Sequence, residues 1–96
     1  MIRLAVTHAA RRDLKAIARY SEQEWGAARK KLYMAAIRER FAAVLHHSAL
    51  GSPRDDLGSG ARCLAVGRHL IFYRVEDEEV VILRVLHQRM DVKLHF

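Results

Sequence analysis

Cysteine and proline are nearly absent from these 96 residues, since Cys63 and Pro53 are the single examples of each. One cysteine cannot form an intramolecular disulfide, and it excludes a zinc site made of several thiolates. Cys63 lies within a short strand-like run, so we expect a small buried thiol. Long apolar runs are also absent, whereas a membrane-spanning helix needs about 20 apolar residues. The sequence therefore predicts neither a disulfide scaffold nor a membrane protein.

Several short motifs are missing as well. The opening string MIRLAVTHAARR lacks the order of a signal peptide, in which charge precedes an apolar run of about 7–15 residues, so we expect a cytoplasmic protein. The string GSGARC lacks the lysine of a phosphate-binding loop. His46 and His47 are adjacent and point to different sides of a helix, so they cannot easily share a metal ion. We expect no metal and no cofactor.

Apolar residues make up 51% of the chain, which supports one globular domain over residues 1–96. The net charge of +6 is uneven, because residues 1–31 balance to +5, residues 32–60 to zero and residues 61–96 to +1. A basic face indicates a nucleic acid or an acidic protein as partner, and a merely solvated helical face is the alternative. A nucleic-acid-binding module is one open function, although this face lacks interleaved aromatic residues for stacking single-stranded bases.

The first half of the chain predicts a strand and two helices. Residues 2–6 are β-prone, and Thr7 suits a helix N-cap. A first helix follows, and Gly26 ends it because glycine adopts left-handed backbone angles at little cost. A second amphipathic pattern begins almost at once, so the two helices form an antiparallel hairpin. The apolar positions recur every three or four residues: Ala10, Leu14, Ile17, Ser21 and Trp25, then Met34, Ile37, Phe41, Val44 and Leu45.

The second half predicts a loop and three strands. Residues 48–60 hold three of the five glycines and the proline, which favours a loop. Strands are expected over residues 61–66, 69–75 and 80–87, with Gly67-Arg68 forming a type II′ turn. The order β-α-α-β-β-β predicts an α+β fold, with a helical hairpin packed on a mainly antiparallel sheet. The expected core is Leu14, Ile17, Trp25, Ile37, Phe41, Ile71, Phe72, Ile82, Leu83 and Val85.

A family resemblance covers nearly the whole chain. It is carried by the motif residues Asp13-Leu14, Ile17, Tyr20, Trp25-Gly26, Tyr33, Gly60-x-Arg62, Gly67-x-His69, Ile71-Phe72-Tyr73-Arg74 and the closing string Arg84-Val85-Leu86-His87-Gln88-Arg89-Met90-Asp91. These residues resemble the ParE branch of the ParE/RelE toxin superfamily of bacterial type II toxin–antitoxin systems. In residues 48–56 the chain departs from the pattern, because relatives often carry a proline just after the second helix and this chain has Ser48-Ala49.

The resemblance implies a RelE/ParE-like fold and a toxin that inhibits DNA gyrase by protein–protein binding. It also implies neutralisation by a ParD-like antitoxin and a role in plasmid stabilisation. Nucleic acid would be contacted only indirectly, through gyrase, and no membrane would be involved. Because the first 31 residues are basic, we expect an acidic antitoxin segment along the helical hairpin. The candidate antitoxin-binding residues are Arg11, Arg12, Lys15, Arg19, Lys30 and Lys31.

The alternative is a metal-independent ribonuclease like the RelE toxins, which cut messenger RNA. Such cleavage needs a base, an acid and cations for the phosphorane charge. Two observations count against it, so we expect a non-enzyme. No tyrosine follows Tyr73, whereas RelE-type sites often use a late one, and Asp91 would repel RNA phosphate. The residues that a ribonuclease would use are Arg62, Arg84, His87 and Arg89.

The polar string at residues 84–91 closes an otherwise apolar strand. We expect His87 and Asp91 to tie down the chain end through hydrogen bonds and ion pairs rather than to contact a target. Arg74 and Arg84 lie in apolar strands, so each needs a partner or a route to solvent. The last residues alternate apolar and polar types, with little fold left to bury them. The candidate target-binding residues are Arg89, Met90, Val92, Leu94 and Phe96.

Overall fold

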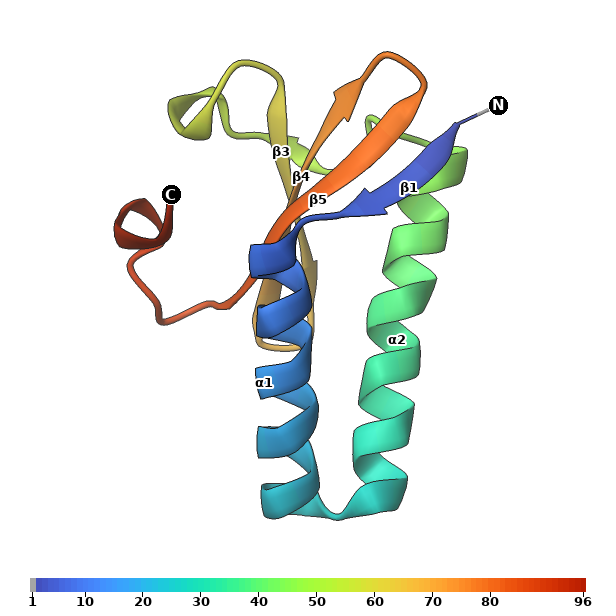
Figure 1. Cartoon of the computed structure of the whole chain (residues 1–96), viewed down its shortest axis with the longest axis vertical. Helices are drawn as coiled ribbons and strands as arrows, with labels where there is room; N and C mark the ends of the chain where they lie inside the picture. Colours follow the sequence, from blue (N-terminus) through green and yellow to red (C-terminus); the bar gives the residue numbers. More distant parts are fainter. Residues whose placement is uncertain (1) are drawn as a thin grey trace.

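The computed structural model describes residues 2–96 and contains a helical hairpin on one face of a five-stranded sheet (Figure 1). Strand β1 is parallel to β5, and every other pairing is antiparallel. The strand order is β1-β5-β4-β3-β2. The elements are β1 (Arg3–Val6), α1 (His8–Trp25), α2 (Ala27–His46), β2 (Ser52–Pro53), the 3₁₀ helix η1 (Asp55–Leu57), β3 (Ala61–Val66), β4 (His69–Glu76), β5 (Glu79–His87) and the 3₁₀ helix η2 (Val92–His95).

The predicted α+β order and the mainly antiparallel sheet are confirmed. The Thr7 hydroxyl caps α1 by accepting from the amide of Ala10 at 3.0 Å. Gly26 separates the helices with φ +86°. Gly67 has φ +55° in the β3–β4 turn, as a type II′ turn requires. The predicted loop over residues 48–60 also holds β2 and η1, which its glycine-rich composition concealed.

A β-bulge in β5 interrupts the regular alternation of its side chains. Phe72 pairs with Arg84 and Tyr73 pairs with Ile82, so Leu83 is an extra residue between them. Ile82 and Val85 consequently face the same helix-covered core, although strict alternation would place them on opposite faces. Leu83 was expected in the core and is only half-buried.

The buried residues are largely the predicted ones. Seven of the ten expected residues are buried: Ile17, Ile37, Phe41, Ile71, Phe72, Ile82 and Val85. Leu14 packs against this cluster and is partly buried. The prediction for Trp25 was wrong, because its side chain is 46% exposed at the end of α1. The helical periodicity that predicted a buried Trp25 continues to the end of α1, where no strand of the described chain covers the indole.

The opposite face of the sheet is covered by the chain end. Phe72 lies on that face and is fully buried, with the ring of Phe96 packed edge-on at 5.4 Å between centroids. The residues after β5 turn back and end in η2 (Figure 1). The prediction that the last residues alternate and remain uncovered is therefore wrong in part. These residues form a 3₁₀ helix, and Phe96 is half-buried. Cys63, paired with Phe72, is half-buried, and burial raises the pKa of its thiol. Over residues 2–96 no helix is long and apolar enough to cross a membrane.

Candidate protein-binding site

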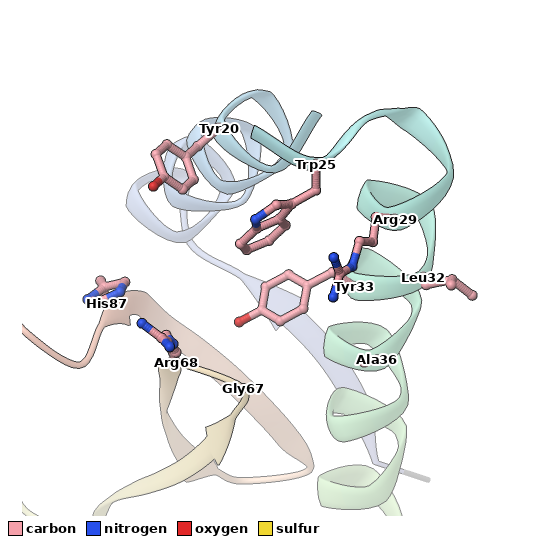
Figure 2. Close-up of a pocket in the computed structure, with 9 residues that line it drawn as sticks. All are labelled: Tyr20, Trp25, Arg29, Leu32, Tyr33, Ala36, Gly67, Arg68 and His87. Atoms are coloured by element: carbon pink, nitrogen blue, oxygen red, sulfur yellow. The ribbon is translucent and has the colours of Figure 1, made fainter. Parts of the chain in front are cut away.

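An open groove lies between the tip of the helical hairpin and the β3–β4 turn (Figure 2). We call it the aromatic groove; its volume is about 750 Å³. The hairpin contributes Tyr20, Trp25, Arg29, Leu32, Tyr33 and Ala36, and the sheet contributes Gly67, Arg68 and His87.

Five rings form a continuous chain through and beneath the aromatic groove. Tyr20 contacts Trp25 with ring centroids 6.2 Å apart, and Trp25 contacts Tyr33 at 6.1 Å. Tyr33 contacts His69 at 5.6 Å, and His69 contacts His87 at 5.3 Å. Most of these contacts are edge-to-face, the geometry favoured by the aromatic quadrupole. The chain of rings links α1, α2, β4 and β5.

Tyr33 is the fixed centre of this chain. Its hydroxyl donates to the Val66 carbonyl at 3.1 Å and lies 2.6 Å from Nδ1 of His69. Burial raises the pKa of Tyr33, and a backbone hydrogen bond from Arg68 partly offsets this increase. A Cβ at Gly67 would lie 2.6 Å from the Tyr33 ring, so only glycine lets the turn approach this closely.

His69 lies half-buried beneath the groove. Burial lowers the pKa of His69 below 6.5, and the charge of neighbouring His87 lowers it further. His87 accepts a hydrogen bond at Nδ1 from the Arg89 amide at 3.1 Å. The predicted structural role of His87 in turning the chain end agrees with this contact. Asp91 likewise accepts from the Lys93 amide at 3.2 Å, which caps η2.

The four residues proposed for RNA cleavage are not brought together. Arg62 donates to the carbonyls of Ala49 and Gly51, and so fastens the loop after α2. Arg62 pairs with Tyr73 of β4, whereas His87 pairs with His69 of the same strand. Tyr73 and His69 are four residues apart, which corresponds to roughly 13 Å along the strand. Arg84 lies across the bulge, in an ion pair with Asp13, and Arg89 is exposed beyond the strand.

The Asp13–Arg84 pair joins α1 to β5 and to the chain end. The guanidinium donates from Nε and Nη2 to the two carboxylate oxygens, each at 2.8 Å. Its Nη1 donates to the His95 carbonyl at 2.7 Å. The hydrogen bond to Asp13 raises the pKa of Arg84. The expectation that Arg84 needs a partner is confirmed, while Arg74 finds Glu76 at 2.6 Å.

The candidate target-binding residues surround η2. Leu94 is 81% exposed, whereas Met90 and Phe96 are each 46% exposed and Val92 is half-buried. Leu94 thus projects from a segment anchored beneath by Phe96. The ring of Phe96 packs against Phe72, whereas the Leu94 side chain faces solvent.

A second, apolar groove runs between α1 and α2, and we call it the interhelical groove. It is walled by Leu4, Leu14, Ala18, Met34, Ile37 and Phe41, with Lys15 and Arg38 at its rim. Among the candidate antitoxin-binding residues, Arg11, Arg12 and Arg19 lie three or four residues from Lys15 on α1. Lys30 and Lys31 stand on the Met34 side of α2, and Lys30 pairs with Glu22 at 3.1 Å. Beside this groove β1 is an edge strand with one side unpaired.

Residues 4–92 match the family described as the ParE toxin of the type II toxin–antitoxin system parDE. The chain belongs to the ParE toxin family. The toxin ParE1 of Caulobacter vibrioides is 38% identical over 90% of this chain and 88% of its own length. The toxin ParE1 of Mycobacterium tuberculosis is 32% identical over 94% and 93%, respectively. The resemblance drawn from the sequence is confirmed.

Solved structures agree with the ParE assignment. The chromosomal ParDE system of P. aeruginosa matches with a TM-score of 0.78 and 25% identity, covering 91% of this chain and 96% of that one. The RelBE2 toxin–antitoxin complex of Mycobacterium tuberculosis matches with a TM-score of 0.65 and 28% identity, covering 90% and 96%. The RelE/ParE-like fold predicted from the sequence is therefore confirmed.

The family resemblance includes Tyr20, Trp25, Tyr33, Gly67 and His69, but the sequence alone did not predict that they form one site. They are separated by up to 49 positions, and they meet only because the hairpin tip overhangs the β3–β4 turn. One signal was available. Tyr20, Trp25 and Tyr33 lie close together in sequence on both sides of the Gly26 break, so their rings can gather at the tip of the helical hairpin.

Proposed function

We propose that this ParE-family chain is the toxin of a type II toxin–antitoxin pair, that it inhibits DNA gyrase by binding, and that a ParD-like antitoxin neutralises it. The family match over residues 4–92 carries the proposal. The likeness to a ParDE system over 91% of the chain supports the choice of antitoxin class. Gyrase works on bacterial DNA, so the proposal places the protein in the cytoplasm, with nucleic acid reached through gyrase.

The contacts of Arg62 and Arg84 within the fold favour binding over catalysis. Arg62 holds two backbone carbonyls, and Arg84 holds Asp13 and the chain end. Phosphoryl chemistry needs cations preorganised around one reacting group. Moving either guanidinium to RNA would leave buried or half-buried partners unpaired. The likeness to the RelBE2 complex keeps a ribonuclease as the alternative, and the experiment below includes it.

The interhelical groove and the free edge of β1 are the proposed antitoxin surface. Its walls are apolar, its rim carries Lys15 and Arg38, and Leu4 links it to the edge strand. An acidic amphipathic segment would bury its apolar face between the helices and could add a strand to β1. Such a segment would order on binding, because it has no core of its own.

The surface around η2 is the proposed gyrase contact. Leu94 is 81% exposed on a segment that Arg84 and Phe96 hold against the sheet. A rigid apolar projection loses little conformational freedom on binding, which favours affinity. Arg89 and Met90 lie on the same chain segment and would extend the contact.

Two assays in parallel test the proposal. Purified protein is added to gyrase with supercoiling as the readout, and to translating ribosomes with messenger RNA cleavage as the readout. We expect inhibited supercoiling and intact RNA, and His87→Ala should act only as far as it lowers stability. RNA cleavage that disappears in a folded His87→Ala protein, with gyrase unaffected, would establish the ribonuclease instead.

A further inference from the structure

Three large apolar side chains that line the aromatic groove are exposed to solvent. Leu32 is 72% exposed, Tyr20 57% and Trp25 46%, and all three line the same groove. Clustered apolar side chains of this size usually mark an interaction surface. The antitoxin and tail surfaces described above do not account for them.

The groove is also cationic, with no carboxylate among its lining residues. Arg29 lies over the Trp25 ring at 6.0 Å, and Arg68 projects from the β3–β4 turn (Figure 2). Over residues 2–96 neither guanidinium is in an ion pair, whereas Lys30, Arg54, Arg74 and Arg84 all are. A partner segment with carboxylates beside an apolar anchor would complement this lining.

The ring geometry favours a protein segment over single-stranded nucleic acid. Bases bind to aromatic platforms by stacking on exposed ring faces. Here Tyr20 and Tyr33 meet Trp25 at 83° and 74°, and Arg29 lies over the indole. Successive bases cannot stack on perpendicular rings. A leucine or phenylalanine side chain can pack against them, because edge-to-face contacts suit it.

The aromatic groove is joined to the proposed gyrase contact and, within the described chain, shares no lining residue with the antitoxin surface. The Gln88 amide donates to the Arg68 carbonyl at 2.8 Å, so the groove rim and the start of the chain end are joined. On α2, Tyr33 and Ala36 line the aromatic groove, whereas Met34 and Ile37 line the interhelical groove. At about 100° per residue the centres of these two pairs lie roughly 100° apart, on adjacent faces of the helix.

We infer that the aromatic groove binds an acidic segment of gyrase that inserts one apolar anchor beside Trp25, with its carboxylates on Arg29 and Arg68. The inference rests on the proposed function and adds a second contact to the η2 surface. Tyr33, locked by Val66 and His69, makes the floor rigid before binding. A preformed floor reduces the entropy lost on association.

Photocrosslinking identifies the occupant directly. Tyr20 is replaced by p-benzoylphenylalanine, which keeps an aromatic ring at the groove mouth, and gyrase with a labelled plasmid is added before irradiation. The matched control carries the same group in place of Leu50, which is 44% exposed in the loop after α2. We expect position 20 to crosslink to an acidic gyrase peptide and position 50 not to. Crosslinks to DNA, or to no component of the gyrase–DNA mixture, overturn the inference.

Charge-reversal variants measure how much Arg29 and Arg68 contribute to gyrase inhibition. Arg29→Glu/Arg68→Glu should raise the half-inhibitory concentration about tenfold or more, since two rim cations meet carboxylates. Arg40→Glu, on the same helix but outside the groove, should change it less than twofold, and circular dichroism confirms folding of each. Unchanged potency of the double variant overturns the inference and leaves gyrase inhibition standing. A wild-type protein that does not inhibit gyrase overturns the proposed function itself, and the choice of target with it.

Discussion

Asp13 and Arg84, 71 residues apart in the sequence, form a two-pronged ion pair with both N–O distances at 2.8 Å. The carboxylate also accepts from the Val85 amide at 2.9 Å, beside the bulge in β5. The side chains are only 12% and 19% exposed. This pair therefore fixes α1, the bulged strand and the chain end relative to one another.

Removing one member should be costly, because the other charge stays buried. We expect Asp13→Ala to lower the free energy of unfolding by about 3–5 kcal/mol. Asp13→Asn should cost less, since its amide oxygen still accepts from Val85. Urea denaturation measures both. A double variant, Asp13→Ala/Arg84→Met, should cost less than the sum of its single variants. Strict additivity would show that the pair is not coupled.

Two neighbouring apolar residues near the chain end should separate stability from inhibition. Leu94→Ala should leave the melting temperature unchanged, because Leu94 is 81% exposed, yet weaken gyrase inhibition. Phe96→Ala should lower stability by about 1–2 kcal/mol, since Phe96 covers Phe72 but is half-exposed. Thermal unfolding and supercoiling are measured on both, with Leu50→Ala as the exposed control. A destabilising Leu94→Ala would mean that η2 packs differently.

The stability of the fold should fall in mildly acidic solution through His69. Its folded pKa is below 6.5, so in the pH window beneath 6.5 the unfolded chain binds more protons than the folded one. This loss is absent above that window and grows as the pH falls toward the folded pKa. His69→Gln should retain more of its pH 7.5 stability at pH 5.5 than the wild type does. Urea titrations at both pH values test this, and parallel losses would exclude His69 as the cause.

Reversing the rim of the interhelical groove should weaken antitoxin binding selectively. Lys15→Glu/Arg38→Glu removes two cations beside the apolar wall, so association with an acidic antitoxin should slow and lose its salt dependence. Surface plasmon resonance between about 0.05 and 0.5 M salt measures the rates. Arg40→Glu supplies the control on the same helix. Association of the wild type that is insensitive to salt would contradict an electrostatically steered antitoxin.

Local chemistry made much of the fold predictable. The Thr7 hydroxyl, the break at Gly26 and the turn at Gly67 each act within a few residues, and each appears where the sequence placed it. Periodicity likewise located seven of the ten expected core residues, Ile37 and Phe41 among them. These features depend on short-range backbone preferences that a single sequence records directly.

Long-range pairing was not predictable. Nothing near Asp13 specifies Arg84, and nothing near Phe72 specifies that Phe96 will cover it. The bulge at Leu83 shifts the register of β5 and so changes which side chains share a face. The candidate site depends on such pairings, which is why its rings were recognised one by one and not as a groove.

A titration of supercoiling at several gyrase concentrations distinguishes inhibition by stoichiometric binding from catalytic turnover. Once gyrase exceeds the dissociation constant, a binding inhibitor must match it mole for mole. We predict that the half-inhibitory concentration of this protein rises in proportion to gyrase. Loss of supercoiling at a small, fixed amount of protein, independent of gyrase concentration, would indicate catalytic turnover and contradict the account.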